Sequence, residues 1–354
     1  MRRPADELAM ADIPFDVTVL DAWLARHVAG YGGPLQVERF AGGQSNPTYR
    51  LTAASGSYVL RKKPDGVLLP SAHAVDREHR VITALRDTSV PVPRTHAYCD
   101  DASVIGSPFF VMDCVEGRIF WDPALPELTR VERAALWSDV NRVVAALHLV
   151  DIDSVGLADY GRPGNYFERQ IGRWTKQYRA AEMDRIEAMD RLIDWLPLHI
   201  PPGDETAIVH GDLRLDNMII HVTEPRVVAV LDWELSTIGH PLADLSYHVM
   251  TWRLDAEQFR GMADKDLSAL GIPSEAAYVA AYCARVGRPP VERSAWEFHM
   301  VFSMFRLAAI LQGIAKRAQQ GTAASVQALE NGRKARPIAE VAWRHVEALQ
   351  AGPS

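Results

Sequence analysis

The feature that most constrains this chain is a cluster of acids and amides that lies between short apolar segments beyond its middle. The cluster reads, in order, His210-Gly211-Asp212-Leu213-Arg214-Leu215-Asp216-Asn217. Apolar runs at 207–209, 218–221 and 227–231 surround it, and Asp232 follows the last of them. Runs this short, with polar residues between them, are typical of small strands joined by turns. The cluster and Asp232 are therefore expected on successive loops of small hairpins.

These residue types suit the transfer of a phosphoryl group from ATP. That reaction needs a group to orient the accepting hydroxyl, oxygen ligands for Mg²⁺ and cations beside the phosphates. Asp212 can supply the first role, and Asn217 on the same loop can supply one metal ligand. Asp232, at the end of the next hairpin, can supply the other ligand. The alternative interpretation is an acidic turn between two strands, in which Asp216 and Asn217 only form the turn.

The pattern of apolar residues divides the chain into a strand-rich part and a helical part. In the first part a short amphipathic helix is expected within residues 1–28, strands at 35–40, 48–52, 57–62, 94–98 and 109–115, and a helix at 74–86. In the second part helices are predicted at 129–150, 166–183, 190–196, 275–286 and 296–320, with one more after Pro241. The sequence thus predicts an α+β protein with an N-terminal β-rich lobe, 1–115, and a mainly helical lobe, 116–354.

Composition excludes several classes of partner. The 354 residues carry 38 Lys and Arg against 45 Asp and Glu, a formal charge of −7, which gives little electrostatic attraction for nucleic acid. The most apolar stretch, 298–314, is interrupted by Arg306 and is too short to span a bilayer. The three cysteines are scattered and no apolar leader follows the first residues, so we expect a cytoplasmic protein that binds neither nucleic acid nor membrane.

The polar cluster resembles the catalytic loop and metal-binding aspartate of protein kinases, in the variant used by aminoglycoside phosphotransferases and choline-kinase-like enzymes. This resemblance implies a bilobal protein-kinase-like fold, with ATP and Mg²⁺ as cofactors. It implies that Asp212 is the catalytic base and that Asn217 and Asp232 hold the metal. Arg214 would lie near the transferred phosphate, and His210 is expected to brace the loop by hydrogen bonds.

A glycine-containing segment of the first lobe matches the place where kinases carry their phosphate-covering loop. Its residues, which lie between two predicted strands, are Gly42, Gly43, Gln44, Ser45 and Asn46. Backbone N–H groups there could reach the β- and γ-phosphates of ATP. A tight hairpin explains the two glycines equally well.

The strand at 57–62 occupies the position where kinases carry their phosphate-binding lysine. Alternation along a strand puts Val59 and Arg61 on one face, so that Val59 would cover the adenine and Arg61 would replace the lysine. Lys62 or Lys63 could share that task. Glu78 in the following helix is the candidate partner of the cation, although a solvated glutamate is an equal alternative.

The strand at 109–115 is expected to continue into the linker between the lobes. There Met112 would lie by the nucleotide, and backbone groups of Asp113 and Val115 would bond the adenine edge. Plain core packing is the alternative for Met112. Beyond the cluster, Asp244 is interpreted as a structural acid that ties down the loop of the metal ligand.

A basic helix face indicates what kind of accepting molecule the protein could bind. Arg169, Arg173 and Lys176 recur at helical spacing and could hold an anionic acceptor, although such a face is usually only solvated. Segments at 59–64, 166–170 and 305–313 resemble the kinase-like region of acyl-CoA dehydrogenase family members ten and eleven. That resemblance covers about residues 35–330 and implies a 4-hydroxyacyl-CoA as the acceptor.

Two alternatives stay open at this point. An aminoglycoside kinase of the 3′ type would need exposed acids near the end of the chain, where Glu330, Glu340 and Glu347 are outweighed by basic residues. A catalytically silent nucleotide-binding module, a pseudokinase, is favoured by Arg61 and by the atypical glycine segment. The complete set of Asp212, Asn217 and Asp232 argues against it.

Overall fold

The chain folds into two compact units. The computed structural model describes residues 8–9, 13–40, 46–64, 74–320 and 327–352. The first unit comprises Met1–Phe120, Asp153–Leu157 and Leu215–Ser236, and the second comprises Trp121–Ile152, Ala158–Arg214 and Thr237–Ser354. The division between them therefore crosses the polar cluster, between Arg214 and Leu215.

A six-stranded antiparallel sheet with the strand order β1-β2-β3-β4-β6-β5 forms the centre of the first unit. Its strands are β1 (Leu8–Ala9), β2 (Gln36–Phe40), β3 (Thr48–Ala53), β4 (Gly56–Lys62), β5 (Thr95–Cys99) and β6 (Phe109–Asp113). The helices of this unit are α1 (Val17–His27), α2 (Val75–Leu85) and α3 (Ala102–Ile105). Strand β4 lies between β3 and β6, and its residue Arg61 is opposite Thr48 and Phe110.

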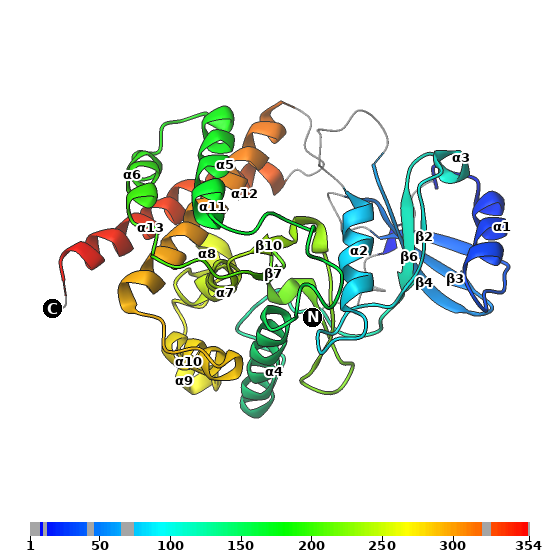
Figure 1. Cartoon of the computed structure of the whole chain (residues 1–354), viewed down its shortest axis with the longest axis horizontal. Coiled ribbons are helices and arrows are strands. Elements are labelled where there is room, and N and C mark those ends of the chain that lie inside the picture. The colour runs from blue at the N-terminus through cyan, green and yellow to red at the C-terminus, as the bar shows by residue number, and fades with distance from the viewer. Residues whose placement is uncertain (1–7, 10–12, 41–45, 65–73, 321–326, 353–354) are drawn as a thin grey trace. The chain divides into compact units, whose positions relative to one another are not determined.

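Helices α1 and α2 cover opposite faces of this sheet (Figure 1). Trp23 of α1 packs in a buried cluster with Tyr58 and Leu60 of β4. Because successive side chains of a strand point to opposite faces, Val59 and Arg61 lie on the other face, toward α2. The sheet therefore separates an apolar core under α1 from the polar residues that matter for the site.

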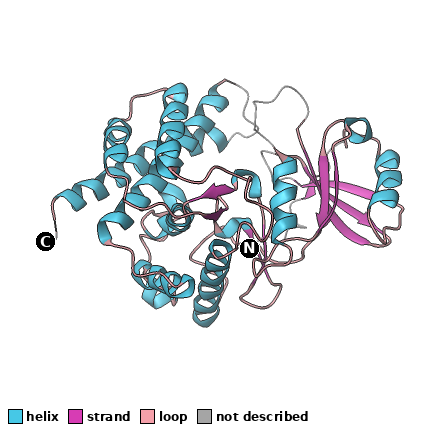
Figure 2. Cartoon of the chain, viewed as in Figure 1, coloured by secondary structure: helices cyan, strands magenta, loops and turns pink. Residues whose placement is uncertain are grey.

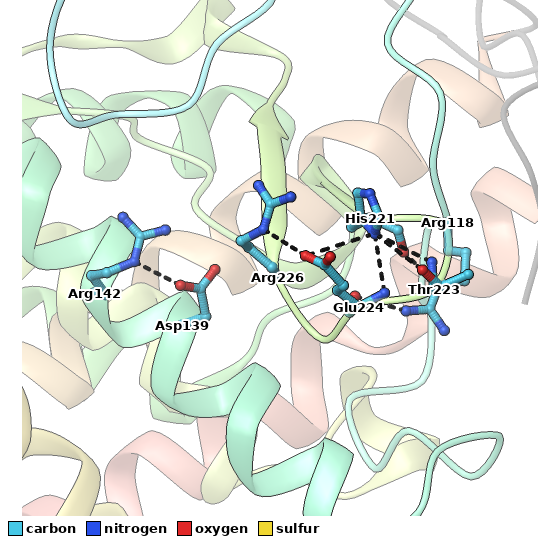
Figure 3. A network of polar contacts seen from close by, with 7 residues as sticks. All are labelled: Arg118, Asp139, Arg142, His221, Thr223, Glu224 and Arg226. Carbon is cyan, nitrogen blue, oxygen red and sulfur yellow. Dashed lines mark hydrogen bonds and ion pairs between the residues drawn. The ribbon is translucent and has the colours of Figure 1, made fainter.

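A small hairpin formed by β8 (Met218–Ile220) and β9 (Val227–Val230) also belongs to the first unit. Arg118 exchanges two backbone hydrogen bonds with Ile220, with N···O distances of 2.7 and 2.8 Å. Its guanidinium also donates to the carbonyls of His221 and Glu224, both at 2.9 Å (Figure 3). Strand β9 donates to the carbonyl of Pro91 in the loop before β5. These bonds fix the hairpin that carries Asn217 and Asp232.

The second unit is almost entirely helical (Figure 2). Its helices are α4 (Arg130–His148), α5 (Tyr166–Ala181), α6 (Glu187–Trp195), α7 (Pro241–Val249), α8 (Ala256–Phe259), α9 (Leu267–Leu270), α10 (Glu275–Val286), α11 (Arg293–Gln319), α12 (Gln327–Arg333) and α13 (Ala335–Gln350). The strands β7 (Ala207–Val209) and β10 (Thr237–Gly239) pair antiparallel. Strand β7 leads directly into the polar cluster.

Helix α11 forms the core of the second unit. It is 27 residues long and packs against α5, α7, α12 and α13. By length and apolarity alone it could cross a membrane, but 83% of its most apolar window is buried inside the protein. That degree of burial is typical of the core helix of a globular unit. Among the described residues, α11 is the one helix that meets this length and apolarity test.

The predicted elements agree closely with those observed, but seven elements of the described chain were not predicted: β1, β10, α3, α8, α9, α12 and α13. Strand β10 carries one large apolar residue, Ile238, between Thr237 and Gly239, which gives little strand signal. Helices α12 and α13 follow residues 321–326, which lie outside the described part of the chain. Helix α13 carries Pro337 within its first turn, where proline is tolerated because the N–H there has no partner in the helix.

Candidate active site

The predicted site residues divide between the two units. Strand β4, helix α2 and the β8–β9 hairpin of the first unit carry Arg61, Glu78, Asn217 and Asp232. The second unit carries the segment 210–214, called here the Asp212 loop, which follows strand β7.

In the first unit Arg61 forms two ion pairs. Its Nε lies 3.0 Å from Oε2 of Glu78, and one terminal nitrogen donates to Oδ1 of Asp232, also at 3.0 Å. The predicted pairing of Arg61 with Glu78 is therefore confirmed. Burial alone would lower the pKa of Arg61, but the two carboxylates outweigh it and raise the pKa above its ordinary value. The guanidinium is thus a fixed positive charge beside a predicted metal ligand.

Glu78 is almost completely buried on helix α2, with 1% of its side chain exposed. Burial raises the pKa of this carboxyl because the charged form loses its hydration, and Arg61 opposes that rise. The ion pair is what makes a buried glutamate tolerable here. The alternative of a solvated Glu78 is wrong.

Lys62 is buried on the sheet face shared with Tyr58 and Leu60, 1% exposed. Alternation along β4 places it on the face opposite Arg61. The suggestion that Lys62 shares the task of Arg61 is therefore wrong, because the sheet lies between the two side chains.

Asp232 and Asn217 are neighbours at the end of the β8–β9 hairpin. The N–H of Leu231 donates to the carbonyl of Asn217 at 2.8 Å, which places Asp232 one residue from that contact. Asp232 has a left-handed backbone, φ 66° and ψ 58°, a conformation that costs energy for a residue with a side chain and that concentrates at functional sites. The Asn217 side chain is mostly buried, whereas 36% of the Asp232 side chain is exposed.

The fit of Mg²⁺ to this pair rests on the donors. Carboxylate and amide oxygens are the hard ligands that Mg²⁺ prefers, and one or two of them suffice when phosphates and waters complete the octahedron. In the described part of the chain no group of three His, Cys, Asp or Glu gathers as a metal site. Asn217 and Asp232 thus suit a metal that a nucleotide shares, not a closed protein cage.

In the second unit the backbone of the Asp212 loop is tied to helix α7. Both oxygens of Asp244 accept backbone bonds, from the N–H of His210 at 2.7 Å and of Gly211 at 2.8 Å. His148 reaches the same carboxylate at 3.4 Å. The N–H of Asp212 donates to Nδ1 of the buried His210 at 3.2 Å. Asp244 therefore ties down the Asp212 loop and not, as predicted, the loop of the metal ligand.

The Asp212 carboxylate is held by two side chains. A terminal nitrogen of Arg214 donates to it at 3.0 Å, and the hydroxyl of Tyr247 donates a further hydrogen bond. Burial alone would raise the pKa of this carboxyl, but Arg214, His210 and Arg306, with the Tyr247 bond, lower it below its ordinary value. The loop thus presents a carboxylate that stays ionised although it is partly buried. Only an ionised carboxylate can accept a proton.

The predicted adenine-binding residues lie on adjoining strands. Val59 and Met112 are paired across β4 and β6, and both are buried. The N–H of Asp113 donates to the carbonyl of Arg94 at 2.8 Å and is therefore not available to an adenine. The role of Val115 stays a prediction. Gly42, Gly43, Gln44 and Ser45 lie outside the described residues, and Asn46 is described and buried.

Comparison with a family model identifies the family of this chain. The family model described as "Phosphotransferase enzyme family" matches residues 36–288, about 70% of the chain. The chain belongs to this phosphotransferase family. The predicted family membership is therefore confirmed.

The phosphotransferase has curated relatives that are much longer. It is 47% identical over 313 residues to acyl-CoA dehydrogenase family member 10 of Mus musculus, covering 88% of this chain and 29% of the relative. It is 40% identical over 333 residues to family member 11 of Homo sapiens, covering 92% and 42%. The chain thus spans less than half the length of these relatives, and both resemblances named from sequence are confirmed.

Solved structures confirm the predicted α+β, two-lobed kinase-like fold. A provisionally named aminoglycoside phosphotransferase from Ralstonia eutropha JMP134 is 53% identical, with a TM-score of 0.87 over 94% of this chain and 99% of that one. Choline kinase from Cryptosporidium parvum Iowa II is 13% identical, with a TM-score of 0.63 over 95% and 97%. A thermostable mutant of aminoglycoside phosphotransferase APH(4)-Ia, in complex with ADP and hygromycin B, is 14% identical, with a TM-score of 0.60 over 92% and 97%. The last two similarities concern the fold alone.

The predicted basic face of α5 is only partly free to meet a ligand. In this phosphotransferase Arg173 and Lys176 are exposed, whereas Arg169 is half-buried and donates to the carbonyl of Arg162 at 2.6 Å. Burial raises the pKa of Tyr166, and the charges of Arg306, Arg173 and Arg169 oppose that rise. These arginines therefore act on a common buried point of the second unit.

Sequence reasoning missed Tyr247 and Arg306, which both act on Asp212. They lie 35 and 94 residues beyond it, so no local motif connects them. One signal was present for Arg306: it is the single Lys, Arg, Asp or Glu between Phe298 and Ile314. A lone cation in an apolar helix requires compensation, and that requirement could have marked it.

Proposed function

We propose that this phosphotransferase transfers the γ-phosphate of ATP to a hydroxyl group of a small molecule. The observation that carries the proposal is the Asp212 carboxylate, kept ionised on a loop whose backbone is bonded to Asp244. A carboxylate in this state can orient an alcohol and accept its proton during in-line transfer. The family membership and the nucleotide complexes of the structural neighbours support ATP as the donor.

In the proposed reaction the acceptor oxygen forms a bond to the γ-phosphorus as the bond from that phosphorus to the β–γ bridging oxygen breaks. ADP leaves with the electron pair of the broken bond, and the proton of the alcohol passes to Asp212. Arg214, bonded to Asp212, supplies positive charge beside the transferred group. The products are ADP and a phosphate ester.

The first unit would hold the nucleotide. Arg61 is fixed by Glu78 and Asp232 and would meet the phosphates as a permanent cation. Asn217 and Asp232 would hold Mg²⁺, which when bound neutralises charge on the phosphate oxygens. Val59 and Met112 would contact the adenine from adjoining strands.

For the acceptor we propose a hydroxyacyl-CoA. Arg173 and Lys176 are exposed on α5, and Arg173 acts on the same Tyr166 as Arg306, which also acts on Asp212. Arg173 and Arg306 thus both act on Tyr166, which lies at the start of α5. The exposed basic residues of α5 suit the phosphates of coenzyme A. The names of the curated relatives, acyl-CoA dehydrogenase family members, agree with an acyl-CoA acceptor.

The test is a panel of acceptors assayed for ADP release with ATP and Mg²⁺. The panel contains a 4-hydroxyacyl-CoA, the matching free 4-hydroxy acid, the aminoglycoside kanamycin and choline. We expect turnover with the CoA thioester, and loss of turnover in Asp212→Asn with ATP affinity retained. Arg173→Glu should raise the KM for the thioester and leave the KM for ATP unchanged, with Arg317→Glu on α11 as the matched control.

Each other outcome has a definite meaning. Turnover of kanamycin but not of the thioester would replace the acceptor and leave the phosphotransferase proposal standing. ATP binding with no turnover of any acceptor above the Asp212→Asn control would favour the nucleotide-binding module. An unchanged KM for the thioester in Arg173→Glu would refute the α5 argument.

A further inference from the structure

Arg306 is a buried cation in α11, the long core helix of the second unit. It lies near the middle of α11, with 6% of its surface exposed. Removing a guanidinium from water costs several kcal/mol unless hydrogen bonds and opposite charge compensate. Replacing a buried ion by an apolar residue of similar volume is often neutral or stabilising. Packing alone therefore gives no reason for an arginine at this position.

Two contacts of Arg306 lead to the Asp212 loop and to Tyr247, and a third is with Trp174 of α5. A terminal nitrogen donates to the carbonyl of Gly211. The guanidinium lies over the ring of Tyr247, 4.7 Å from its centroid, and over the ring of Trp174 at 5.4 Å. Tyr247 in turn donates to the carboxylate of Asp212. One cation thus contacts both the backbone before Asp212 and the residue that bonds its side chain.

The loop is held from two helices at once. Helix α7 supplies Asp244, which accepts the N–H of Gly211, and Tyr247, one turn later on the same face. Helix α11 supplies Arg306, which binds the carbonyl of Gly211. Gly211 has φ 83°, a left-handed conformation that a residue with a side chain would resist. The N–H and the carbonyl of Gly211 are therefore both bonded, and the direction in which Asp212 leaves the loop is set.

We propose that Arg306 is a positioning residue for the phosphoryl transfer proposed above, acting through Gly211 and Tyr247 to fix the direction and charge of Asp212. The inference rests on that proposed function for its catalytic readout. The groups that act on the Asp212 carboxylate include Arg214 and His210 from the loop, Tyr247 from α7 and Arg306 from α11. Arg306 also acts on Tyr247, because its guanidinium lies over the ring of that residue.

The direction of the pKa shift of Asp212 agrees with this geometry. Burial would raise the pKa, and Arg306 is among the charges that lower it. Loss of Arg306 should therefore move the titration of Asp212 to higher pH. The acid limb of the rate profile should move the same way, because the base must be ionised to act.

The experiment compares Arg306→Met, Arg306→Lys and Tyr247→Phe with wild type and with the control Arg317→Met. The control removes a cation from the same helix 11 residues away, about 16 Å along its axis. We measure kcat, KM for ATP and the pH profile with the 4-hydroxyacyl-CoA as acceptor, thermal stability, and the titration of the Asp212 carboxyl by ¹³C NMR. The carboxyl signal is assigned from its absence in Asp212→Asn.

In Arg306→Met we expect kcat to fall roughly 10- to 100-fold with the KM for ATP unchanged, because a displaced reacting group costs about that much. The acid limb and the Asp212 titration should move to higher pH. Arg306→Lys should restore part of kcat, and Tyr247→Phe should share the shift. The control should match wild type throughout.

Three outcomes would overturn the proposal. The first is an unchanged Asp212 titration in Arg306→Met. The second is a fall in kcat accounted for by the fraction of protein unfolded, which would make the role structural. The third, should the Met variant fail to fold, is wild-type behaviour of both Arg306→Lys and Tyr247→Phe. The NMR titration needs no acceptor, so a failure of the proposed function, with no turnover in wild type, is separate from a failure of this inference.

Discussion

Removing the carboxylate of Asp244 should release the backbone of the Asp212 loop. Asp244 is buried on α7 and accepts the N–H groups of His210 and Gly211 at 2.7 and 2.8 Å. Hydrogen bonds to a charged acceptor contribute about 1.5–3 kcal/mol each. Asp244→Ala leaves both donors without this acceptor, whereas Asp244→Asn keeps one oxygen and turns an NH₂ group toward the other donor. The alanine variant should therefore lose about twice as much local stability as one such bond supplies.

Hydrogen exchange measures this loss where it occurs. The loss of both bonds amounts to about 3–6 kcal/mol, and each 1.4 kcal/mol is a factor of ten, so the amides of His210 and Gly211 should exchange about 100- to 10,000-fold faster in Asp244→Ala. Asp244→Asn should lie between the variant and wild type. Mass spectrometry of peptides covering 207–215 reports the change without assuming two-state unfolding of a two-unit chain.

A matched control separates the local effect from general softening. Asp266 caps α9 and accepts the N–H of Ala269 at 3.0 Å. Asp266→Asn should leave exchange at 207–215 unchanged, since asparagine caps a helix as well as aspartate does. Unchanged exchange of His210 and Gly211 in Asp244→Ala would refute the reasoning, because it would mean that the two bonds do not hold the loop.

Three further predictions concern stability. Arg61→Met should lower the stability of the first unit by about 3–5 kcal/mol, because it leaves Glu78 buried without its cation. In thermal unfolding, the double variant with Glu78→Leu should recover most of that loss. No recovery would show that the ion pair is not the cause of the lost stability. Gly117→Ala should lower the stability of the protein by about 1–3 kcal/mol, because a Cβ there would meet a side chain and a carbonyl of the β8–β9 hairpin. Gly172→Ala, with open space on α5, should raise the stability by up to about 1 kcal/mol. Similar melting temperatures for the two variants would contradict the close approach of Gly117 to the hairpin. Burial raises the pKa of Glu275, but its other contacts, chiefly the ion pair with Arg253, together lower that pKa below the ordinary 4.5. The stability that the ionised Glu275 contributes is therefore complete above pH 4.5 and is lost as the pH falls through the lower, folded-state pKa. The difference in melting temperature between wild type and Glu275→Gln should accordingly disappear in acid.

Much of the fold could be predicted because its elements are locally encoded. Strand β3 alternates between more and less buried residues, and helices such as α2 and α5 repeat their apolar residues at helical spacing. The failures have local causes as well. Strand β10 has a single large apolar residue and forms because β7 offers a partner, whereas the equally short β7 is wholly apolar and was predicted. Pairing between distant segments depends on the tertiary structure, so a strand with so little apolar character is not recognised from its own residues.

The division of the chain into units could not be predicted by placing one boundary in the sequence, because each unit contains separate segments of the chain. The prediction of lobes at 1–115 and 116–354 follows the change from strands to helices. In the structure residues 215–236 group with the first unit, because Arg118 and Pro91 bond the β8–β9 hairpin. These partners lie more than 100 residues away in the sequence. Composition along the chain carries no record of such contacts.

By itself the sequence determined the family of this protein and predicted its reactive groups, because Asp212 and Asn217 lie on one loop and Asp232 follows the next hairpin, so that together they form a recognisable motif. The tertiary structure alone decided the surroundings of Asp212. Tyr247 and Arg306, which act on its carboxylate, come to it on α7 and α11 from distant parts of the chain. A short motif can be read from neighbouring residues, whereas the electrostatic field and the packing around a reactive group depend on every segment that folding brings near it.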